Sequence, residues 1–159
     1  MYVEKTMKLG FSTVDINRFD ELNIFEGLKE DFPEYKDKRI NMIQRGQCDV
    51  FVAMDDDRYI GEVTAKYINE DLDNETIPNT RAYFEAFRIH IFYQDVGIGQ
   101  QLMNYAIDYL KNKGYTEFTV GVESWNRNAV HIYQKLGFTE KINIGKTGKY
   151  GYDLYLKRV

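Results

Sequence analysis

The sequence predicts an α/β fold in a single domain, and three observations support this prediction. The chain has 159 residues, a typical size for one domain with its own hydrophobic core. From residue 81 onward the pattern runs strand, helix, strand, helix, strand. The sequence shows no internal repeat and no low-complexity tract that would mark a second domain. We therefore expect residues 1–159 to form a single domain.

The residues before position 81 predict three strands and two helices. Pro33 breaks the chain ahead of the second helix, and Gly46 ends that helix. Aspartates at 55–57 favour a turn between two of the strands. The expected elements are a strand at 2–9, a helix beginning at 13–15, a helix at 34–45, strands at 49–54 and 59–67, and a polar connecting loop at 68–82.

The second half contains the alternating strands and helices. The fourth strand is expected from residue 81 onward, and its apolar, aromatic run from residue 85 stops at the turn before the two glycines. The helix that follows has Leu102, Met103, Ala106 and Leu110 on one face. The remaining expected elements are that helix at 99–112, a strand at 116–122, a helix at 127–136, and a half-buried strand at 150–157.

Composition excludes several classes of protein. Lys and Arg total 21 against 25 Asp and Glu, so the formal charge is −4 and no basic surplus marks a nucleic-acid-binding protein. The single cysteine, Cys48, excludes an internal disulfide framework and suits a reducing compartment. The first residues lack the apolar stretch of a signal peptide, and no run reaches the roughly 20 apolar residues of a membrane span. We therefore expect a cytoplasmic protein without a membrane partner.

Two acidic clusters each allow a functional and a structural interpretation. Adjacent carboxylates in the tight turn at 55–57 cannot all face one ion, so we expect no metal there. The acidic residues of the loop at 68–82 either form an ordinary solvated loop or make an acidic rim that attracts a cationic amine. These loop residues are Glu70, Asp71, Asp73 and Glu75.

Two glycines at the turn after the fourth strand predict an anion site. Gly97 and Gly99 let the backbone come close to a ligand, and free N–H groups at the start of the helix point toward a phosphate. A dinucleotide-binding motif requires Gly or Ala where this chain has Leu102. A P-loop requires Gly-Lys-Ser/Thr, whereas Gln100 and Gln101 follow the second glycine here. The spacing therefore excludes both of these phosphate sites.

A second block of motif residues lies about thirty residues further on. Together the two blocks resemble the GNAT superfamily of acetyl-CoA-dependent N-acetyltransferases. That family has Gln or Arg, two residues, Gly, one residue and Gly or Ala, followed by an Asn-x-x-Ala helix that ends in Tyr-x-Lys-x-Gly-Phe. The resemblance covers about residues 81–140. The matching residues are Gln94, Gly97, Gly99, Asn126, Ala129, Tyr133, Lys135, Gly137 and Phe138.

The resemblance implies a fold and an activity. The fold would be a central, mixed and mostly antiparallel sheet, splayed between its fourth and fifth strands and flanked by helices. The activity would be direct transfer of an acetyl group from acetyl-CoA to a primary amine of a small molecule or peptide. The alternative is a non-catalytic acyl-CoA-binding regulatory module of the same fold. The resemblance leaves a homodimer open and implies neither a metal nor a nucleic-acid partner.

The resemblance also implies how acetyl-CoA is held. Backbone groups of the fourth strand would pair with the pantetheine like an added strand, and amides at the start of the helix would hold the pyrophosphate. One departure is Asp95, because the family usually has a Lys or Arg in this loop, so we expect a site with lower affinity. The expected binding residues are Ile89, His90, Ile91, Gln94, Val96, Gly97, Ile98, Gly99, Gln100, Gln101, Leu102, Asn126 and Tyr133.

Two residues are the leading catalytic candidates. Tyr133 matches the family's acid, whose phenol protonates the departing sulfur, although a tyrosine on this helix face also fits simple core packing. Glu85 lies where several family members carry a general base. The alternative for Glu85 is a solvated carboxylate or an ion pair with Arg81 or Arg88.

Other proton acceptors stay open. Some family members place a glutamate on the fifth strand where this chain has Gly121, so Glu123 is a reserve. His90 is another candidate base because imidazole can accept a proton, and a water chain is a further option. Cys48 lies outside both motif blocks, which favours direct transfer without an acyl-enzyme. The acceptor-facing segments at 20–35, 68–82 and 143–151 carry no motif that identifies the amine.

Overall fold

The computed structural model describes residues 6–25, 31–68, 74–142 and 152–159. Within these residues the chain forms a seven-stranded sheet in the order β1-β2-β3-β4-β5-β7-β6. The strands are β1 (Leu9–Thr13), β2 (Cys48–Asp55), β3 (Arg58–Lys66), β4 (Arg81–Ile89), β5 (Glu117–Glu123), β6 (Glu140–Ile142) and β7 (Tyr152–Arg158). The helices are the 3-10 helices η1 (Ile16–Ile24) and η2 (Ile91–Tyr93), and the α-helices α1 (Phe32–Gln44), α2 (Ile98–Lys111) and α3 (Arg127–Lys135).

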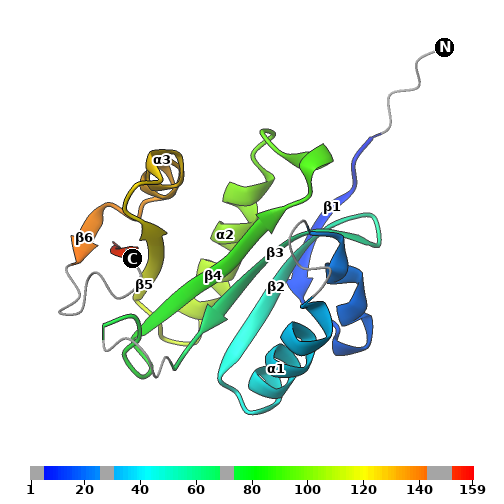
Figure 1. Cartoon of the computed structure of the whole chain (residues 1–159), viewed down its shortest axis with the longest axis horizontal. Helices are drawn as coiled ribbons and strands as arrows, with labels where there is room; N and C mark the ends of the chain where they lie inside the picture. The colour runs from blue at the N-terminus through cyan, green and yellow to red at the C-terminus, as the bar shows by residue number, and fades with distance from the viewer. Residues whose placement is uncertain (1–5, 26–30, 69–73, 143–151) are drawn as a thin grey trace.

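The sheet is mixed and splayed. All neighbouring strands are antiparallel except β4 and β5, which are parallel. Residues 81–84 of β4 pair with residues 117–120 of β5, whereas β4 continues to Ile89 without that partner. The two strands diverge from this point (Figure 1), which leaves a gap inside the sheet. The predicted α/β fold and the splay between the fourth and fifth strands are confirmed.

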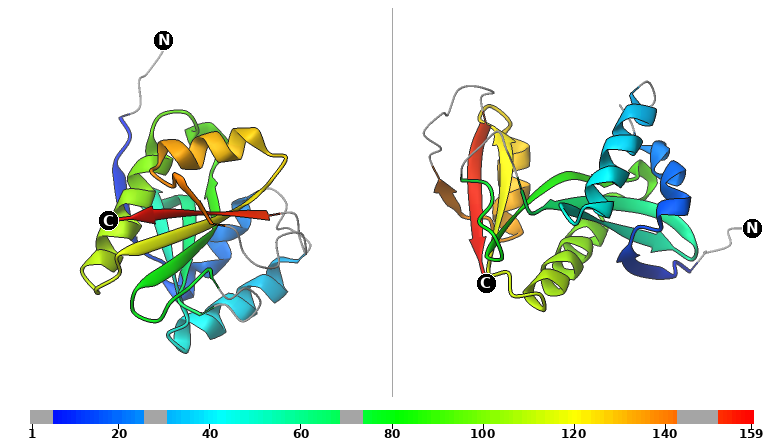
Figure 2. Two further views of the ribbon diagram at one scale, coloured as in Figure 1. Left: turned by 90° about the vertical axis from the view of Figure 1, so that its left-hand side faces the viewer. Right: turned by 90° about the horizontal axis from the view of Figure 1, so that it is seen from below.

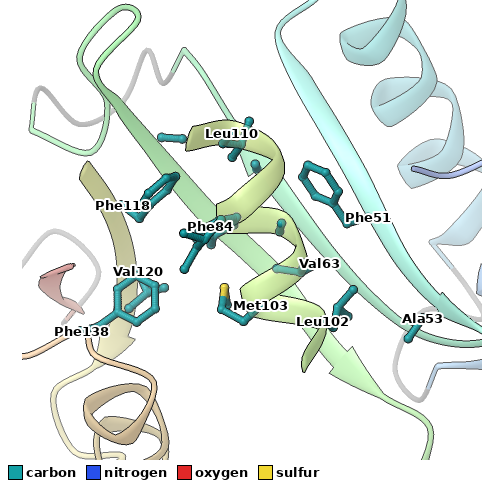
Figure 3. Close-up of a cluster of buried hydrophobic side chains, with 14 of the residues drawn as sticks. Phe51, Ala53, Val63, Phe84, Leu102, Met103, Leu110, Phe118, Val120 and Phe138 are labelled. Atoms are coloured by element: carbon teal, nitrogen blue, oxygen red, sulfur yellow. The ribbon is translucent and has the colours of Figure 1, made fainter. Parts of the chain in front are cut away.

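Helices cover both faces of the sheet. In the view from below, η1 and α1 lie on one side of β2–β4 and α2 lies on the other (Figure 2). The α2 side holds the larger core, in which side chains of α2 such as Leu102 and Met103 meet Phe84 and Phe118 (Figure 3). The η1 and α1 side holds a second core that includes Phe19 and Phe32. No helix in the described residues is long and apolar enough to cross a membrane.

Several boundaries differ from the predicted ones. The first strand begins at Leu9, later than the predicted 2–9, because residues 9–13 are the ones that pair with β2. The first helix is a 3-10 helix, and the Asp15 carboxylate accepts a hydrogen bond from the Asn17 N–H at its start. Strand β6 was not predicted, because three residues are too few to show a period. The expected acceptor-facing segment at 143–151, which includes the start of the last predicted strand, lies outside the described residues.

A bulge in β4 sets which side chains face which helix. Ala86 has φ of 54°, a left-handed conformation rare for alanine, and the register with β3 shifts there. Thr64 pairs with Glu85, whereas Glu62 pairs with Arg88. Phe84 and Phe87 consequently both pack on the α2 side. The charged residues Glu85 and Arg88 face α1.

Candidate active site

The gap begins where β4 loses its partner β5. The His90 N–H donates to the Ile60 carbonyl at 2.8 Å, so the His90 amide faces β3. Because backbone groups alternate along a strand, the amides of Phe87 and Ile89 face the gap. Ile91 begins η2 and is no longer part of the strand. The geometry therefore changes the expected pairing edge from Ile89, His90 and Ile91 to Phe87 and Ile89, and its pairing with pantetheine stays a prediction.

A pocket of about 660 Å³ opens at this edge. It lies between the end of β4, the turn before α2 and one face of α3, and its lining includes Phe87, Ile89, Gly97, Gly99, Ala129 and Tyr133. Gln94 also lines the pocket, and its Nε2 donates to the Ile89 carbonyl at 2.9 Å. The structure thus brings motif residues from both blocks to one cavity.

The two glycines of the turn have different roles. Gly97 precedes α2 with φ of 85°, and an added Cβ would meet no atom within 4 Å. Its requirement is the left-handed backbone, and the space beside it is open. Gly99 has the opposite constraint, because its Cβ would lie 3.0 Å from Phe87 Cζ. Gly99 therefore allows α2 to pack closely on β4.

The start of α2 presents free amides to the pocket. In an α-helix the first N–H groups have no acceptor within the helix. Here these are the amides of Ile98, Gly99 and Gln100, whereas the Gln101 N–H donates to the Gly97 carbonyl at 3.2 Å. Leu102 is fully buried in the core. The expectation of ligand amides from Val96 to Leu102 is therefore corrected at its end, since Gln101 and Leu102 belong to the helix ladder.

Helix α3 supplies the other wall of the pocket. Asn126 caps the helix, and its Oδ1 accepts a hydrogen bond from the Ala129 N–H at 3.1 Å. The cap uses only the side-chain oxygen, so the side-chain nitrogen of Asn126 takes no part in it. Tyr133 packs its ring against Phe87 and Phe138, with ring centroids 6.2 and 6.0 Å apart. Burial raises the pKa of the Tyr133 phenol, which keeps it protonated.

Comparison with known proteins agrees with this geometry. Residues 16–138 match the model of the acetyltransferase (GNAT) family. This chain belongs to the GNAT family.

Among curated relatives, the chain is similar to N-alpha-acetyltransferase 30 of Schizosaccharomyces pombe, with 35% identity over 88 residues that cover 55% of each protein. It is also similar to the L-amino acid N-acyltransferase MnaT of Escherichia coli, with 31% identity over 64 residues that cover 40% of this chain and 37% of that protein. These matches span about half or less of the length of the curated relatives.

Solved structures show the same fold. The PaiA N-acetyltransferase of Thermoplasma acidophilum, in complex with coenzyme A, has a TM-score of 0.71 and 21% identity, with 96% of this chain and 100% of that chain covered. The RimL ribosomal L7/L12 alpha-N-protein acetyltransferase, also with coenzyme A, has a TM-score of 0.70 and 16% identity, with 98% and 96% covered.

On the opposite face of the GNAT sheet, Glu85 is held by two cations. Its Oε1 lies 2.8 Å from Arg39 Nη1 and 3.3 Å from Lys66 Nζ. Burial raises the pKa of Glu85, but Arg39 and Lys66 outweigh burial and the net pKa is lowered. The expected partners Arg81 and Arg88 are wrong, because Arg81 pairs with Glu117 and Arg88 with Glu62.

Glu62 is a candidate that the sequence analysis missed. It is completely buried on β3, where its Oε1 accepts from the Tyr35 hydroxyl at 3.2 Å and lies 3.5 Å from Arg88 Nη1. Its Oε2 accepts no hydrogen bond from the residues that the structure describes. Burial raises the pKa of Glu62 to about 7, against the opposing effects of Arg88, Tyr35 and Arg39. The available signal was a lone acid within an apolar strand, which is where pKa values are displaced.

The reserve acids and bases have structural neighbours of their own. His90 Nδ1 accepts a hydrogen bond from the Phe92 N–H at 3.3 Å and so acts as an N-cap. An added Cβ at Gly121 would lie 2.8 Å from the Tyr83 hydroxyl, so that tyrosine fills the space where other members place a glutamate. Glu123 ends β5. Glu75, expected on a polar loop, is 3% exposed and so does not contribute to an acidic rim, whereas Glu70, Asp71 and Asp73 lie outside the described residues.

Proposed function

We propose that this chain transfers an acetyl group from acetyl-CoA directly to a primary amine of a small molecule or peptide. The observation that carries the proposal is the gap between β4 and β5, because a free strand edge, free helix amides and the Tyr133 phenol all line one pocket there. Family membership supports the reaction class. The acceptor amine would approach from the face of β4 that lies opposite the pocket, where the proposed bases are.

The pocket has the groups that acetyl-CoA needs. The edge at Phe87 and Ile89 would hydrogen-bond the pantetheine amides as an added strand does. The free amides at the start of α2 and the positive end of its dipole suit the pyrophosphate. The amide nitrogen of Asn126 would reach the pantetheine arm. Asp95, which is exposed and has φ of 64°, places a carboxylate beside this site and lowers the affinity for phosphates.

The chemistry requires one bond to form and one to break. The amine nitrogen attacks the thioester carbonyl carbon, and the C–S bond breaks as the tetrahedral intermediate collapses. A backbone N–H at the β4 edge would stabilise the oxyanion. The Tyr133 phenol would give its proton to the departing thiolate, and its raised pKa ensures that the proton is present at neutral pH. The ammonium proton passes to a base on the α1 side.

Glu85 and Glu62 are the two proposed bases, and pH distinguishes them. Glu85 is ionised at neutral pH but is a weak proton acceptor, because its pKa is lowered. Glu62 has a pKa of about 7, which suits a base, but it is enclosed and would act through water or Tyr35. An acidic limb of kcat/KM near pH 7 that disappears in Glu62→Gln assigns the role to Glu62. An acidic limb at a pH below the pKa of free carboxylates assigns the role of base to Glu85.

The second candidate function is a non-catalytic module that binds acetyl-CoA. The pairing of Glu85 with two cations and the presence of Asp95 favour it, because both weaken parts of the reaction site. Thiol release measured across a panel of amines, with acetyl-CoA binding followed by calorimetry, separates the two functions. Binding together with thiol release supports the transferase, and binding without release for any amine supports the module.

A further inference from the structure

A layer of charged side chains lies between α1 and strands β3 and β4. We call it the charged layer, and its members are Arg39, Glu62, Lys66, Glu85 and Arg88. Two carboxylates in the layer face three cations, since Glu85 pairs with Arg39 and Lys66 while Glu62 pairs with Arg88. The layer therefore has an excess of positive charge on the face of β4 that lies opposite the acetyl-CoA pocket.

Arg88 is the cation of this layer closest along the strand to the gap. It lies between Phe87 and Ile89, whose amides face the gap, and its own side chain projects on the α1 side. Its side chain is 32% exposed, compared with 10% for Arg39 and 17% for Lys66. A ligand that enters from the α1 side would therefore meet Arg88 first.

The bonding of Arg88 leaves donors for a ligand. A guanidinium carries five N–H donors in a planar fork. Among the residues that the structure describes, Arg88 makes one long contact, 3.5 Å from its Nη1 to Glu62 Oε1, and its Cζ lies 5.9 Å from the centroid of the Tyr35 ring. Because the pKa of Glu62 is about 7, that carboxyl is protonated in part of the population at neutral pH and then leaves the charge of Arg88 uncompensated.

We propose that Arg88 binds a carboxylate carried close to the acceptor amine, as in a free amino acid. The inference rests on the proposed acetyl transfer and names the class of acceptor. A carboxylate matches the fork of an arginine with two hydrogen bonds. Polyamines carry further positive charges, which the charged layer repels, so they are poor acceptors for this chain.

Matched acceptors test the proposal directly. Alanine, phenylalanine and glutamate are compared with their α-amides, and spermidine is added as a cationic amine. Thiol release is measured at about pH 7, where Glu62 is partly protonated, and kcat/KM is corrected for the fraction of free amine, since the amides have lower amine pKa values. Wild-type protein should prefer the amino acids by about 10- to 100-fold, the range for a charge-assisted pair. A tripeptide that begins with aspartate, compared with one that begins with asparagine, distinguishes a side-chain carboxylate from an α-carboxylate.

Variants assign the preference to Arg88. Arg88→Gln should lower kcat/KM for the amino acids by about 10- to 100-fold and leave the amides within about threefold. Arg88→Lys should recover part of the loss, because it keeps the charge without the fork. The control Arg45→Gln removes an exposed positive charge at the end of α1 and should change neither class of acceptor. If the single variant folds poorly, Arg88→Gln is made together with Glu62→Gln, which avoids a buried unpaired carboxylate, and is compared with Glu62→Gln alone, because Glu62 is itself a proposed base.

Two kinetic results would overturn the inference. Equal kcat/KM for amino acids and amides in the wild type shows that no carboxylate is recognised. An equal loss for both classes in Arg88→Gln shows that this arginine is structural. If no amine releases thiol, the proposed transferase function fails, and binding still decides the inference. Calorimetry with N-acetylalanine and N-acetylalaninamide, in the presence of coenzyme A, should show tighter binding of the carboxylate only when Arg88 is present, and equal binding refutes the assignment.

Discussion

Replacing Glu62 by glutamine should change how the stability of the protein depends on pH. Glu62 is fully buried, and burial raises its pKa from 4.5 to about 7. Between these two values the folded protein keeps a proton on Glu62 that the unfolded chain has lost. The free energy of unfolding therefore falls as pH rises through this window. Glutamine has the same shape and no charge, so the variant lacks this loss.

The size of the effect follows from the shift. One unit of pKa difference corresponds to about 1.4 kcal/mol, so the wild type should lose about 3 kcal/mol between pH 5 and pH 8 through this group alone. The variant should have nearly the same stability as the wild type at about pH 5 and should be more stable at about pH 8. The attraction between Arg88 and the ionised carboxylate is already included in the pKa of about 7, so the slope of stability against pH is the diagnostic quantity.

Urea unfolding followed by circular dichroism at several pH values measures the slope. Glu85→Gln is the matched control with the opposite sign: the pKa of Glu85 is lowered, so its contribution is present above the unfolded pKa and is lost as pH falls. Parallel curves for wild type and Glu62→Gln from pH 5 to pH 8 would refute the assignment of a raised pKa to Glu62.

Three further predictions concern the acetyl-CoA pocket. Gly97→Asp should weaken acetyl-CoA binding by about tenfold relative to Gly97→Asn in calorimetry, because both residues tolerate the left-handed backbone and only aspartate repels the phosphates. Equal affinities would show that the pyrophosphate does not bind at this turn. Tyr133→Phe should keep acetyl-CoA affinity and lower turnover by about 100-fold, since it removes only the hydroxyl from a packed ring, whereas normal turnover would make the tyrosine structural. Asp95→Asn should tighten acetyl-CoA binding by about threefold at low salt, and the gain should disappear at about 0.5 M salt; a gain that persists would point to a contact other than charge.

The parts of the site built from neighbouring residues were predictable. The turn at Gly97 and the cap at Asn126 depend on backbone geometry within a few residues, so their sequence signal is local. The helices and strands of the second half are likewise marked by periodicity over a single segment. The same locality explains why Gly99 was misread, because its requirement comes from Phe87 on another element.

The parts built from distant contacts were not predictable. Glu85 pairs with Arg39 on α1, 46 residues away in the sequence, and no pattern within β4 predicts this partner. The bulge at Ala86 gives no signal either, because alanine is not a residue that favours a left-handed backbone. Without the bulge, simple alternation assigns Phe87 to the face opposite Phe84. The family resemblance predicted a role for the fourth strand. The charged partner of Glu85 on α1 became visible only in the structure.

The gap in the sheet also affects solubility. On the edges that face the gap, residues 87–89 of β4 and residues 121–123 of β5 have no strand partner among the described residues, although each strand is paired on its other edge. Such edges can pair with a strand from another chain, which is a common origin of aggregation. Two features limit this risk here: both edges are short, and the bulge at Ala86 twists one of them away from a flat template. A ligand that occupies the β4 edge would remove it as a template, so acetyl-CoA should raise the yield of soluble protein on refolding.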